Sequence, residues 1–386
     1  MDPTDFETDQ RANCQRQPEG YHAFLPPSLP PLLSIDWKLA ALMSEADRAV
    51  AELSGAGRLL PNPHLLIRSY LRREAVLSSL IEDTYAEMDE LLLFEVEPSV
   101  EPPRASIREV ANHVQALETG LARLTEIPIS SRLIRELHAI LLSTVRGGEN
   151  SKTPGEFRRS QNWIGRPGSN LKTATFVPPP PHELDQLLSD WENYLHAESD
   201  EPDLVKAALL HYQFEAIHPF LDGNGRIGRL LITLFFCARG TLSQPLLYLS
   251  AYFEKYRDEY YRHLLAISTR GDWQEWLIYF LTGVRDTARD ALADTLAITD
   301  LHQNYRSILD TSKRPPTAAA GVLDSLFGSP MLSISVHAGR TGESYQSVSK
   351  AVAFWQKHGL VTEITNQRRH RIFAAPEILK LTRAKA

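Results

Sequence analysis

The residues with the clearest chemical potential lie in one short stretch, residues 218–229, which reads HPFLDGNGRIGR. It brings together an imidazole (His218), a carboxylate (Asp222), three glycines and two guanidinium groups. A histidine with an ordinary pKa of about 6.5 can take a proton near neutral pH. A carboxylate can bind a hard cation such as Mg2+. This combination of groups indicates a phosphoryl or nucleotidyl transfer site.

The glycines and arginines of this stretch are arranged to bind an anion. Gly223, Gly225 and Gly228 let the backbone turn so that several N–H groups point the same way. The helix predicted to begin near Arg226 adds the positive end of its dipole. Arg226 and Arg229 lie in its first turn, where both can donate charge-assisted hydrogen bonds to phosphate oxygens. The spacing suits a triphosphate.

Three other motifs that resemble this stretch do not fit it. The letters GxGxxG match a dinucleotide fingerprint, but a helical pattern precedes them where a strand is required. A P-loop needs lysine at the position of Arg229 and serine or threonine at that of Leu230. An EF-hand that starts at Asp222 needs glycine at the position of Ile227. We therefore interpret the stretch as a loop that opens a helix.

The elements that must position this loop are predicted to be helices. Apolar residues recur at helical spacing over about residues 36–310, and Ser106 with Glu109 fits a capping box at the start of one helix. Pro219 disfavours helical backbone at His218, so the preceding helix should end there. The exception is Asn162–Val177, where short apolar-polar alternations flank a glycine- and proline-containing turn. This pattern predicts a β-hairpin.

Composition limits the class of protein. The chain has 386 residues, of which 43% are hydrophobic and 23% are charged, so it can form a sizeable core and is not mainly disordered or fibrous. Its two cysteines, Cys14 and Cys237, show no disulfide or zinc-site spacing, which fits a reducing cytoplasm. No apolar run has the length of a membrane span or forms a signal peptide. We expect a cytoplasmic protein without a membrane segment.

The C-terminal segment differs from the rest in charge. Residues 331–386 hold nine Lys/Arg and three Asp/Glu, a local charge of +6 within a chain of net charge −7. The pattern predicts a short helix over Leu332–Ala338, a second helix from a cap at Ser344 to about Lys357, a stop at Gly359 and a two-stranded wing. This order is similar to winged-helix domains. DNA contacts are expected from the following residues: Gln346, Ser347, Ser349 and Lys350 in the groove, and Arg368, Arg369 and Arg371 on phosphates. Dimerisation or target docking is an equally open use of such a domain.

Residues 218–229 resemble the signature of the Fic family, HxFx(D/E)GNGRxxR, with all eight specified positions matched. The order of the surrounding features extends the resemblance to about residues 25–300. It implies transfer of AMP from ATP, with Mg2+, to a Ser, Thr or Tyr hydroxyl of a target protein or of the chain itself. By the same resemblance His218 is the general base and Asp222 holds Mg2+. The implied ATP-binding residues are Gly223, Asn224, Gly225, Arg226, Ile227, Gly228, Arg229 and, by position, Tyr260. The hairpin resembles the flap that holds the target segment by strand addition.

A second segment resembles the family's inhibitory pattern (S/T)xxxE(G/N). Ser78 and Glu82 match it, whereas Asp83 departs from the glycine or asparagine of the pattern. On a helix Ser78 and Glu82 share one face, so Glu82 can reach Arg229 and form a bidentate ion pair. The resemblance implies that this pair denies Arg229 to the γ-phosphate and inhibits the enzyme in cis.

Together these inferences predict a mainly α-helical Fic bundle with a β-hairpin flap and a C-terminal winged helix-turn-helix domain. The expected organisation is a flexible segment (1–24), an N-terminal helical region with the inhibitory helix (25–100), the catalytic core (101–310), a linker (311–325) and the winged helix (326–386). Two alternatives stay open: a Fic-like enzyme that moves another nucleotide or phosphate or removes AMP, and an ATP-sensing DNA-binding regulator. A homodimer is compatible with such a fold.

Overall fold

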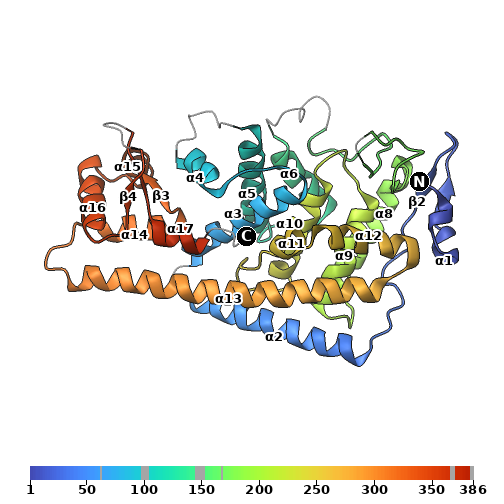
Figure 1. The fold of residues 1–386 in the computed structure, drawn as a ribbon, viewed down its shortest axis with the longest axis horizontal. Helices are drawn as coiled ribbons and strands as arrows, with labels where there is room; N and C mark the ends of the chain where they lie inside the picture. Colours follow the sequence, from blue (N-terminus) through green and yellow to red (C-terminus); the bar gives the residue numbers. More distant parts are fainter. Residues whose placement is uncertain (61–62, 97–103, 144–152, 167, 366–369, 383–386) are drawn as a thin grey trace.

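The computed structural model describes residues 1–60, 63–96, 104–143, 153–166, 168–365 and 370–382. The chain is mainly helical, as the sequence predicts. Two long helices, α2 (Trp37–Leu59) and α13 (Trp273–Thr311), pack along each other. Asp36 caps the start of α2 by accepting the N–H of Leu39. Figure 1 shows that α13 runs along most of the molecule, with α2 on one side of it and most of the other helices on the opposite side.

The core is built around two consecutive helices, α9 (Asp203–Ile217) and α10 (Asn224–Ala238). Almost every side chain of α9 is buried, including both apolar and polar ones, which places this helix at the centre of the bundle. The surrounding helices are α3 (Pro63–Ile81), α4 (Met88–Val96), α5 (Ala105–Arg123), α6 (Ser131–Leu141), η2 (Pro181–Glu183), α8 (Leu184–His196), α11 (Ser250–Lys255) and α12 (Arg257–Arg270). The loop of interest joins the two innermost helices, so its ends are fixed by the core.

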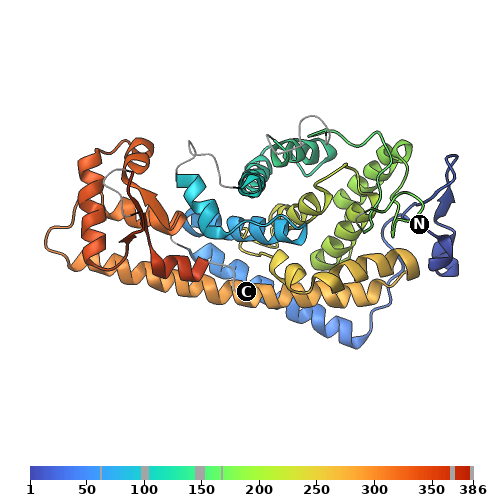
Figure 2. The ribbon, with the colours of Figure 1, turned by 45° about the horizontal axis from the view of Figure 1, so that its top comes forward.

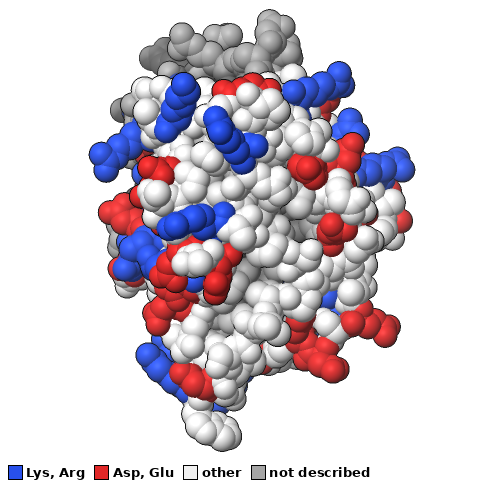
Figure 3. Space-filling model, turned by 90° about the vertical axis from the view of Figure 1, so that its right-hand side faces the viewer, with Lys and Arg blue, Asp and Glu red and all other residues white. Residues whose placement is uncertain are grey.

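The first 24 residues correct one expectation, because they pack on the bundle. They form η1 (Pro3–Asp5), α1 (Thr8–Arg11) and an antiparallel hairpin of β1 (Cys14–Arg16) and β2 (His22–Phe24). Phe6 and Phe24 are buried and stack on each other, and the Glu7 N–H donates to the carbonyl of Thr269 at 2.8 Å. Two buried aromatic rings give this segment an apolar anchor that its acidic composition hides. The end of the molecule that carries it shows charges of both signs around a broad uncharged band (Figure 3).

The hairpin predicted over 162–177 is present in a short form. Ile164 and Phe176 form an antiparallel bridge, with the Ile164 N–H donating to Phe176 at 2.8 Å and the Phe176 N–H donating back at 3.0 Å. The capping box predicted at Ser106 and Glu109 is wrong. Helix α5 begins at Ala105 without a side-chain cap, and the Ser106 hydroxyl donates to the carbonyl of Tyr85.

The C-terminal residues form a small domain at one end of α13, opposite the N-terminal hairpin (Figures 1 and 2). Its elements are α14 (Ala319–Gly328), β3 (Met331–Ser333), α15 (Ile334–Thr341), α16 (Tyr345–Lys357), β4 (Thr362–Glu363), β5 (Ile372–Ala374) and α17 (Pro376–Thr382). The strands pair antiparallel in the order β3-β5-β4. Ser344 caps α16, and Gly359 has a φ of 79°, in agreement with the predicted start and stop.

Two details of this domain differ from the sequence-based expectations. The helix expected over 332–338 begins at Ile334, because Met331–Ser333 join the sheet as β3. In the expected linker, 311–325, α13 extends to Thr311 and α14 starts at Ala319, so the connection is 312–318. In the part of the chain that the structure describes, no helix combines the length and apolar character that a membrane crossing requires.

Candidate active site

The loop between α9 and α10 has a backbone that turns sharply at both ends. His218 lies in the left-handed region with a φ of 50°, which ends α9, and Gly223 with a φ of 81° forms the N-cap of α10. The side-chain amide of Asn224 bridges the loop: its oxygen accepts the Phe220 N–H at 2.8 Å, and its nitrogen donates to the Phe220 carbonyl at 2.9 Å. The side chain of Asn224 thus holds the shape of the loop.

His218 is held in the form that a general base requires. Its Nδ1 lies 3.2 Å from the carbonyl oxygen of Glu215. Because a carbonyl only accepts, Nδ1 carries the proton and Nε2 keeps a free lone pair. Burial lowers the pKa of His218 to about 4, even though the Glu215 carbonyl works in the opposite direction. The imidazole is therefore neutral at physiological pH.

Two residues that the motif does not contain hold the loop from outside. Arg158 is buried and donates to the carbonyls of His218 (2.9 Å) and Pro179 (2.5 Å). On α6, His138 accepts the Gly155 N–H at Nδ1 and donates from Nε2 to the Asp222 carbonyl, both at 2.9 Å. Neither contact leaves a signal in the sequence, because each partner lies many positions away.

His138 also supports the loop through its ring. It stacks on buried Phe220 with the ring centroids 3.7 Å apart. Burial lowers the pKa of His138 to about 4, so the ring stays neutral in this position. His138 thus holds both Phe220, the apolar anchor of the loop, and Asp222, which carries the carboxylate of the loop.

The first turn of α10 has the features of an anion cradle. Backbone N–H groups at a helix start have no partner within the helix, and they add the positive end of the dipole. Arg226 is buried and lies 3.2 Å from Glu109 and 3.7 Å from Asp222. Its Nε has no hydrogen-bond partner among the described residues. Glu109, which the sequence suggested as a helix cap, instead orients this arginine.

Arg229 is the second cation of the cradle. Its guanidinium group already donates hydrogen bonds to Ser78 on α3 and to Glu82 just after that helix. Its Nε donates to the Ser78 hydroxyl at 2.9 Å, and its Nη2 donates to the Ser78 carbonyl at 2.9 Å and to Glu82 at 2.8 Å. The ion pair expected between Glu82 and Arg229 is confirmed, but it is a single contact and not bidentate. The side chain of Arg229 is 1% exposed and that of Glu82 is 34% exposed. Nη1 of Arg229 has no partner among the described residues.

The turn after Glu82 accommodates Asp83, which stands where the inhibitory pattern has glycine or asparagine. Helix α3 ends at Ile81, and Asp83 takes a φ of 56°. This left-handed conformation favours glycine and asparagine, and aspartate tolerates it because its short polar side chain finds a local partner. Here that partner is Arg257, 2.7 Å from the carboxylate. The turn therefore keeps its geometry despite the substitution.

Two glycines of the motif are closely approached by a carboxylate. A Cβ at Gly225 would collide with the Glu82 carboxylate, and a Cβ at Gly228 would collide with that of Glu215. Burial raises the pKa of Glu215 to about 8, against the opposing effect of Arg229, so this group is largely protonated at neutral pH. Its position in the sequence resembles that of a surface glutamate. The structure shows that the residue is partly buried and that its Oε1 is buried against Gly228.

The side chains of two residues expected to bind the nucleotide, Tyr260 and Ile227, are buried. Tyr260 is 1% exposed, and its hydroxyl lies 2.8 Å from Nε2 of His211, so it serves the aromatic core. Its neighbour Tyr261 is partly exposed and donates to the Ile81 carbonyl at 3.2 Å. Ile227 is fully buried and contributes only backbone to the first turn. The helical register turns the side chains of Tyr260 and Ile227 inward, which position in a motif does not reveal.

Asp222 offers the carboxylate of the site. Its Oδ1 accepts the Gly223 N–H at 2.7 Å, and the side chain stays partly exposed. Among the described residues no group of three or more His, Cys, Asp or Glu side chains is arranged to hold a metal ion. A single carboxylate fits a Mg2+ ion that takes its other ligands from phosphates and water.

Two regions of the chain match models of one protein family. Residues 40–122 match the model described as Fic/DOC family N-terminal, and residues 128–236 match the Fic/DOC family model. The helical core and the loop that opens α10 thus define a Fic-type fold and site. The chain belongs to the Fic/DOC family.

Similar proteins agree with this assignment. Over 189 residues the chain is 31% identical to Protein adenylyltransferase Fic of Drosophila grimshawi. The matched region covers 48% of this chain and 34% of that protein. It is 34% identical over 158 residues to the protein of the same name from Drosophila ananassae, covering 40% and 27%. A Fic family protein from Desulfovibrio desulfuricans G20 has a similar fold, with a TM-score of 0.56, 19% identity and coverage of 90% and 98%. The chain spans about a third of the length of the first of these relatives.

Proposed function

We propose that this chain is a protein adenylyltransferase that transfers AMP from ATP to a Ser, Thr or Tyr hydroxyl of a target protein and of itself. The observation that carries this proposal is the juxtaposition of a neutral His218 with the cradle at the start of α10, in a chain of the Fic/DOC family. A base beside an anion site is what transfer of a phosphorus group to a hydroxyl requires.

In the proposed reaction, Nε2 of His218 accepts the proton of the target hydroxyl. The hydroxyl oxygen forms a bond to the α-phosphorus, the bond from that phosphorus to the bridging oxygen breaks, and pyrophosphate leaves. Because burial lowers the pKa of His218, the imidazole is available to accept a proton without first losing one. Arg158 and His138 hold the loop and so position the base and Asp222.

The cradle would hold the phosphates. Backbone N–H groups of Gly225 and Arg226 lie at the start of α10, where they can bind phosphate oxygens. The Arg226 guanidinium would bind the same charge from the side, together with Arg229 once that residue is released. Asp222 would hold a Mg2+ ion, which when bound neutralises charge on the phosphates.

We propose further that Glu82 inhibits the enzyme in cis. Its carboxylate pairs with Arg229 and lies directly over Gly225, where a phosphate would otherwise approach the first turn of α10. Two negative groups cannot share this place, so ATP must either displace Glu82 or bind in a misaligned pose. Regulation would act by moving the end of α3.

The flap is the proposed docking site for the target segment. Trp163 and Ile164 are partly exposed there, and the bridge between Ile164 and Phe176 offers extended backbone for strand addition. Binding through backbone would align a hydroxyl with little dependence on the target's side chains.

For the C-terminal residues we propose a winged-helix domain over 326–386, joined to the catalytic core (101–310) through the linker region 311–325, with the inhibitory region over 25–100. Helices α15 and α16 meet at Gly342, and a three-stranded sheet packs beside them, which supports this proposal. Gln346 and Lys350 on α16 are exposed, as DNA contacts require. Arg368 and Arg369 lie outside the described residues.

DNA binding and dimerisation make different predictions for this domain. A DNA-binding domain should shift duplex DNA in a gel in a salt-dependent manner, and Lys350→Glu should abolish the shift. A dimerisation domain should give a dimer in sedimentation without any shift.

Comparison of the two phosphorus labels of ATP tests the proposed chemistry. With Glu82→Gly, label from the α position should enter protein and label from the γ position should not. Glu82→Gly/His218→Ala should incorporate neither label. Incorporation of the γ label would identify a kinase-type reaction and overturn the proposal. If the enzyme transfers nothing to itself, the same labels are offered with a cell lysate, which supplies other hydroxyl groups.

A further inference from the structure

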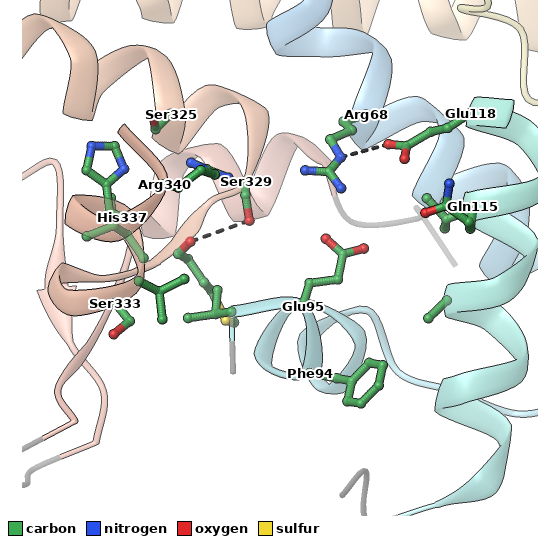
Figure 4. A pocket seen from close by; sticks show the side chains of 16 residues that line it. Arg68, Phe94, Glu95, Gln115, Glu118, Ser325, Ser329, Ser333, His337 and Arg340 are labelled. Carbon is green, nitrogen blue, oxygen red and sulfur yellow. Dashed lines mark hydrogen bonds and ion pairs between the residues drawn. The ribbon is translucent and has the colours of Figure 1, made fainter. Parts of the chain in front are cut away.

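A cavity that residues 218–229 do not line lies where the C-terminal domain meets α3, α4 and α5 (Figure 4). Its volume is about 280 Å³, which is the size for a small ligand. One part of its wall is apolar and comes from both sides of the junction: Phe94, Val96, Leu332 and Val336. The catalytic residues described above do not reach it.

The polar part of the wall carries two arginines, Arg68 and Arg340, and two glutamates, Glu95 and Glu118; Glu118 pairs with Arg68, and Glu95 pairs with Arg72 behind the wall. Arg68 on α3 uses its Nε for Glu118 at 2.7 Å, and Figure 4 shows the rest of its guanidinium facing the cavity. Arg340 on α15 lies across from it; this residue is exposed at the mouth of the cavity and has no hydrogen bond or ion pair within the described residues. Burial and the positive charges of Arg68 and Arg72 lower the pKa of Arg340. An anion between them would relieve this repulsion.

A buried histidine supplies a second observation. His337 lines the cavity and is 3% exposed, yet neither of its ring nitrogens has a hydrogen-bond partner among the described residues. Buried polar groups normally have a partner in the protein, water or a ligand. Burial and Arg340 lower the pKa of His337, so its ring is neutral and offers one N–H donor.

We propose that this cavity binds a small organic anion, a phosphate or carboxylate group on a short apolar body, between Arg68 and Arg340. The anion would take charge-assisted hydrogen bonds from the two guanidinium groups, and its body would lie against the apolar wall. Phosphate and carboxylate share this chemistry, and the test below separates them.

The place of the cavity gives the bound anion a consequence for α3. Arg72, one turn after Arg68, bonds to Glu95 on α4 and donates to the carbonyl of Gly328 at the end of α14 at 2.7 Å. Helix α3 is therefore already tied to the C-terminal domain near its middle, and it carries Ser78 and then Glu82 at its end. An anion that joins Arg68 to Arg340 strengthens this tie and holds Glu82 on Arg229. This regulatory consequence rests on the proposed function, whereas binding of the anion does not.

Calorimetry with the full chain tests the site directly. The probes are inorganic phosphate, glycerol 3-phosphate and butyrate, and the variants are Arg340→Glu, Arg229→Ala and the exposed control Arg314→Ala. At least one organic probe should bind the wild type, and Arg340→Glu should weaken it at least about tenfold. Arg229→Ala and Arg314→Ala should leave its affinity within about twofold. Tighter glycerol 3-phosphate identifies a phosphate site, and tighter butyrate a carboxylate site.

Two outcomes overturn the proposed site: no binding by any of the probes, or binding that Arg229→Ala removes and Arg340→Glu preserves. Hydrogen exchange tests the consequence without using activity. The tighter organic probe should slow amide exchange over residues 74–82 in the wild type and not in Arg340→Glu. Unchanged exchange with proven binding would overturn the link to α3. If Glu82→Gly transfers no AMP to itself or to lysate proteins, the proposed function fails, and the calorimetric result still decides the anion site.

Discussion

Removing the charge of Glu82 should release the cradle and speed AMP transfer. The structure sets the size of the effect. Glu82 accepts one charge-assisted hydrogen bond of 2.8 Å from Arg229, and such a bond contributes about 1.5–3 kcal/mol. Because the Glu82 side chain is 34% exposed, water weakens the pair, and we take the lower value. That corresponds to roughly a tenfold rise in the population with a free Arg229.

Glutamine and glycine at this position separate charge from bulk. Glu82→Gln removes the charge but leaves atoms above Gly225, so we expect roughly a tenfold faster initial rate of self-adenylylation. Glu82→Gly also clears the space over Gly225, so its rate should exceed that of the glutamine variant. The matched control is Glu87→Gln, an exposed glutamate beyond the turn, which should change the rate by less than about twofold.

The assay is the initial rate of label incorporation from the α position of ATP, measured at saturating ATP and Mg2+. Arg229 keeps both contacts with Ser78 in these variants, so the cradle should stay intact. Equal rates in the wild type, Glu82→Gln and Glu82→Gly would refute the reasoning, provided that a target protein or the chain itself is labelled.

Three further predictions concern the base and the side chains that hold it. Because the pKa of His218 is lowered to about 4, the transfer rate of Glu82→Gly should be level on the acid side down to about pH 5 and fall below it; an acid limb near pH 6.5 would contradict this. His138→Phe keeps a ring on Phe220 but leaves the Gly155 N–H and the Asp222 carbonyl without their partner, so the Mg2+ concentration for half-maximal rate should rise several-fold and the melting temperature should fall by a few degrees. Arg158→Met leaves the carbonyls of His218 and Pro179 without their donor and should lower the melting temperature by a few degrees, whereas an unchanged melting curve would show that water replaces it.

The features that could be predicted from sequence are those encoded locally. Helical periodicity predicted the bundle that extends from α2 to α13, and Pro219 and the glycines predicted the loop that opens α10. The i, i+4 spacing of Ser78 and Glu82 predicted that Glu82 would reach Arg229, which the hydrogen bond confirms, and Ser78 on the same face also bonds to Arg229. In each case neighbouring residues in the chain already determine the backbone or the helix face.

The features that the sequence did not predict depend on contacts between distant segments. Glu109 satisfied a capping pattern, yet Arg226, 117 positions away, decides its place. Tyr260 stood at a plausible distance from the motif, but the register of α12 turns it into the core toward His211. The N-terminal 24 residues are anchored by Phe6 and Phe24, which stack on each other, and Phe24 also packs on Phe176, 152 positions away. Local patterns carry no information on such partners.

Intact-mass analysis after incubation with ATP and Mg2+ tests the central claim most directly, with wild type, Glu82→Gly and Glu82→Gly/His218→Ala compared side by side. The account predicts a mass increase of one AMP that is small in the wild type, large in Glu82→Gly and absent in the double variant. An increase of equal size in Glu82→Gly and in the double variant would contradict the role of His218. An increase of one phosphate would contradict nucleotidyl transfer itself.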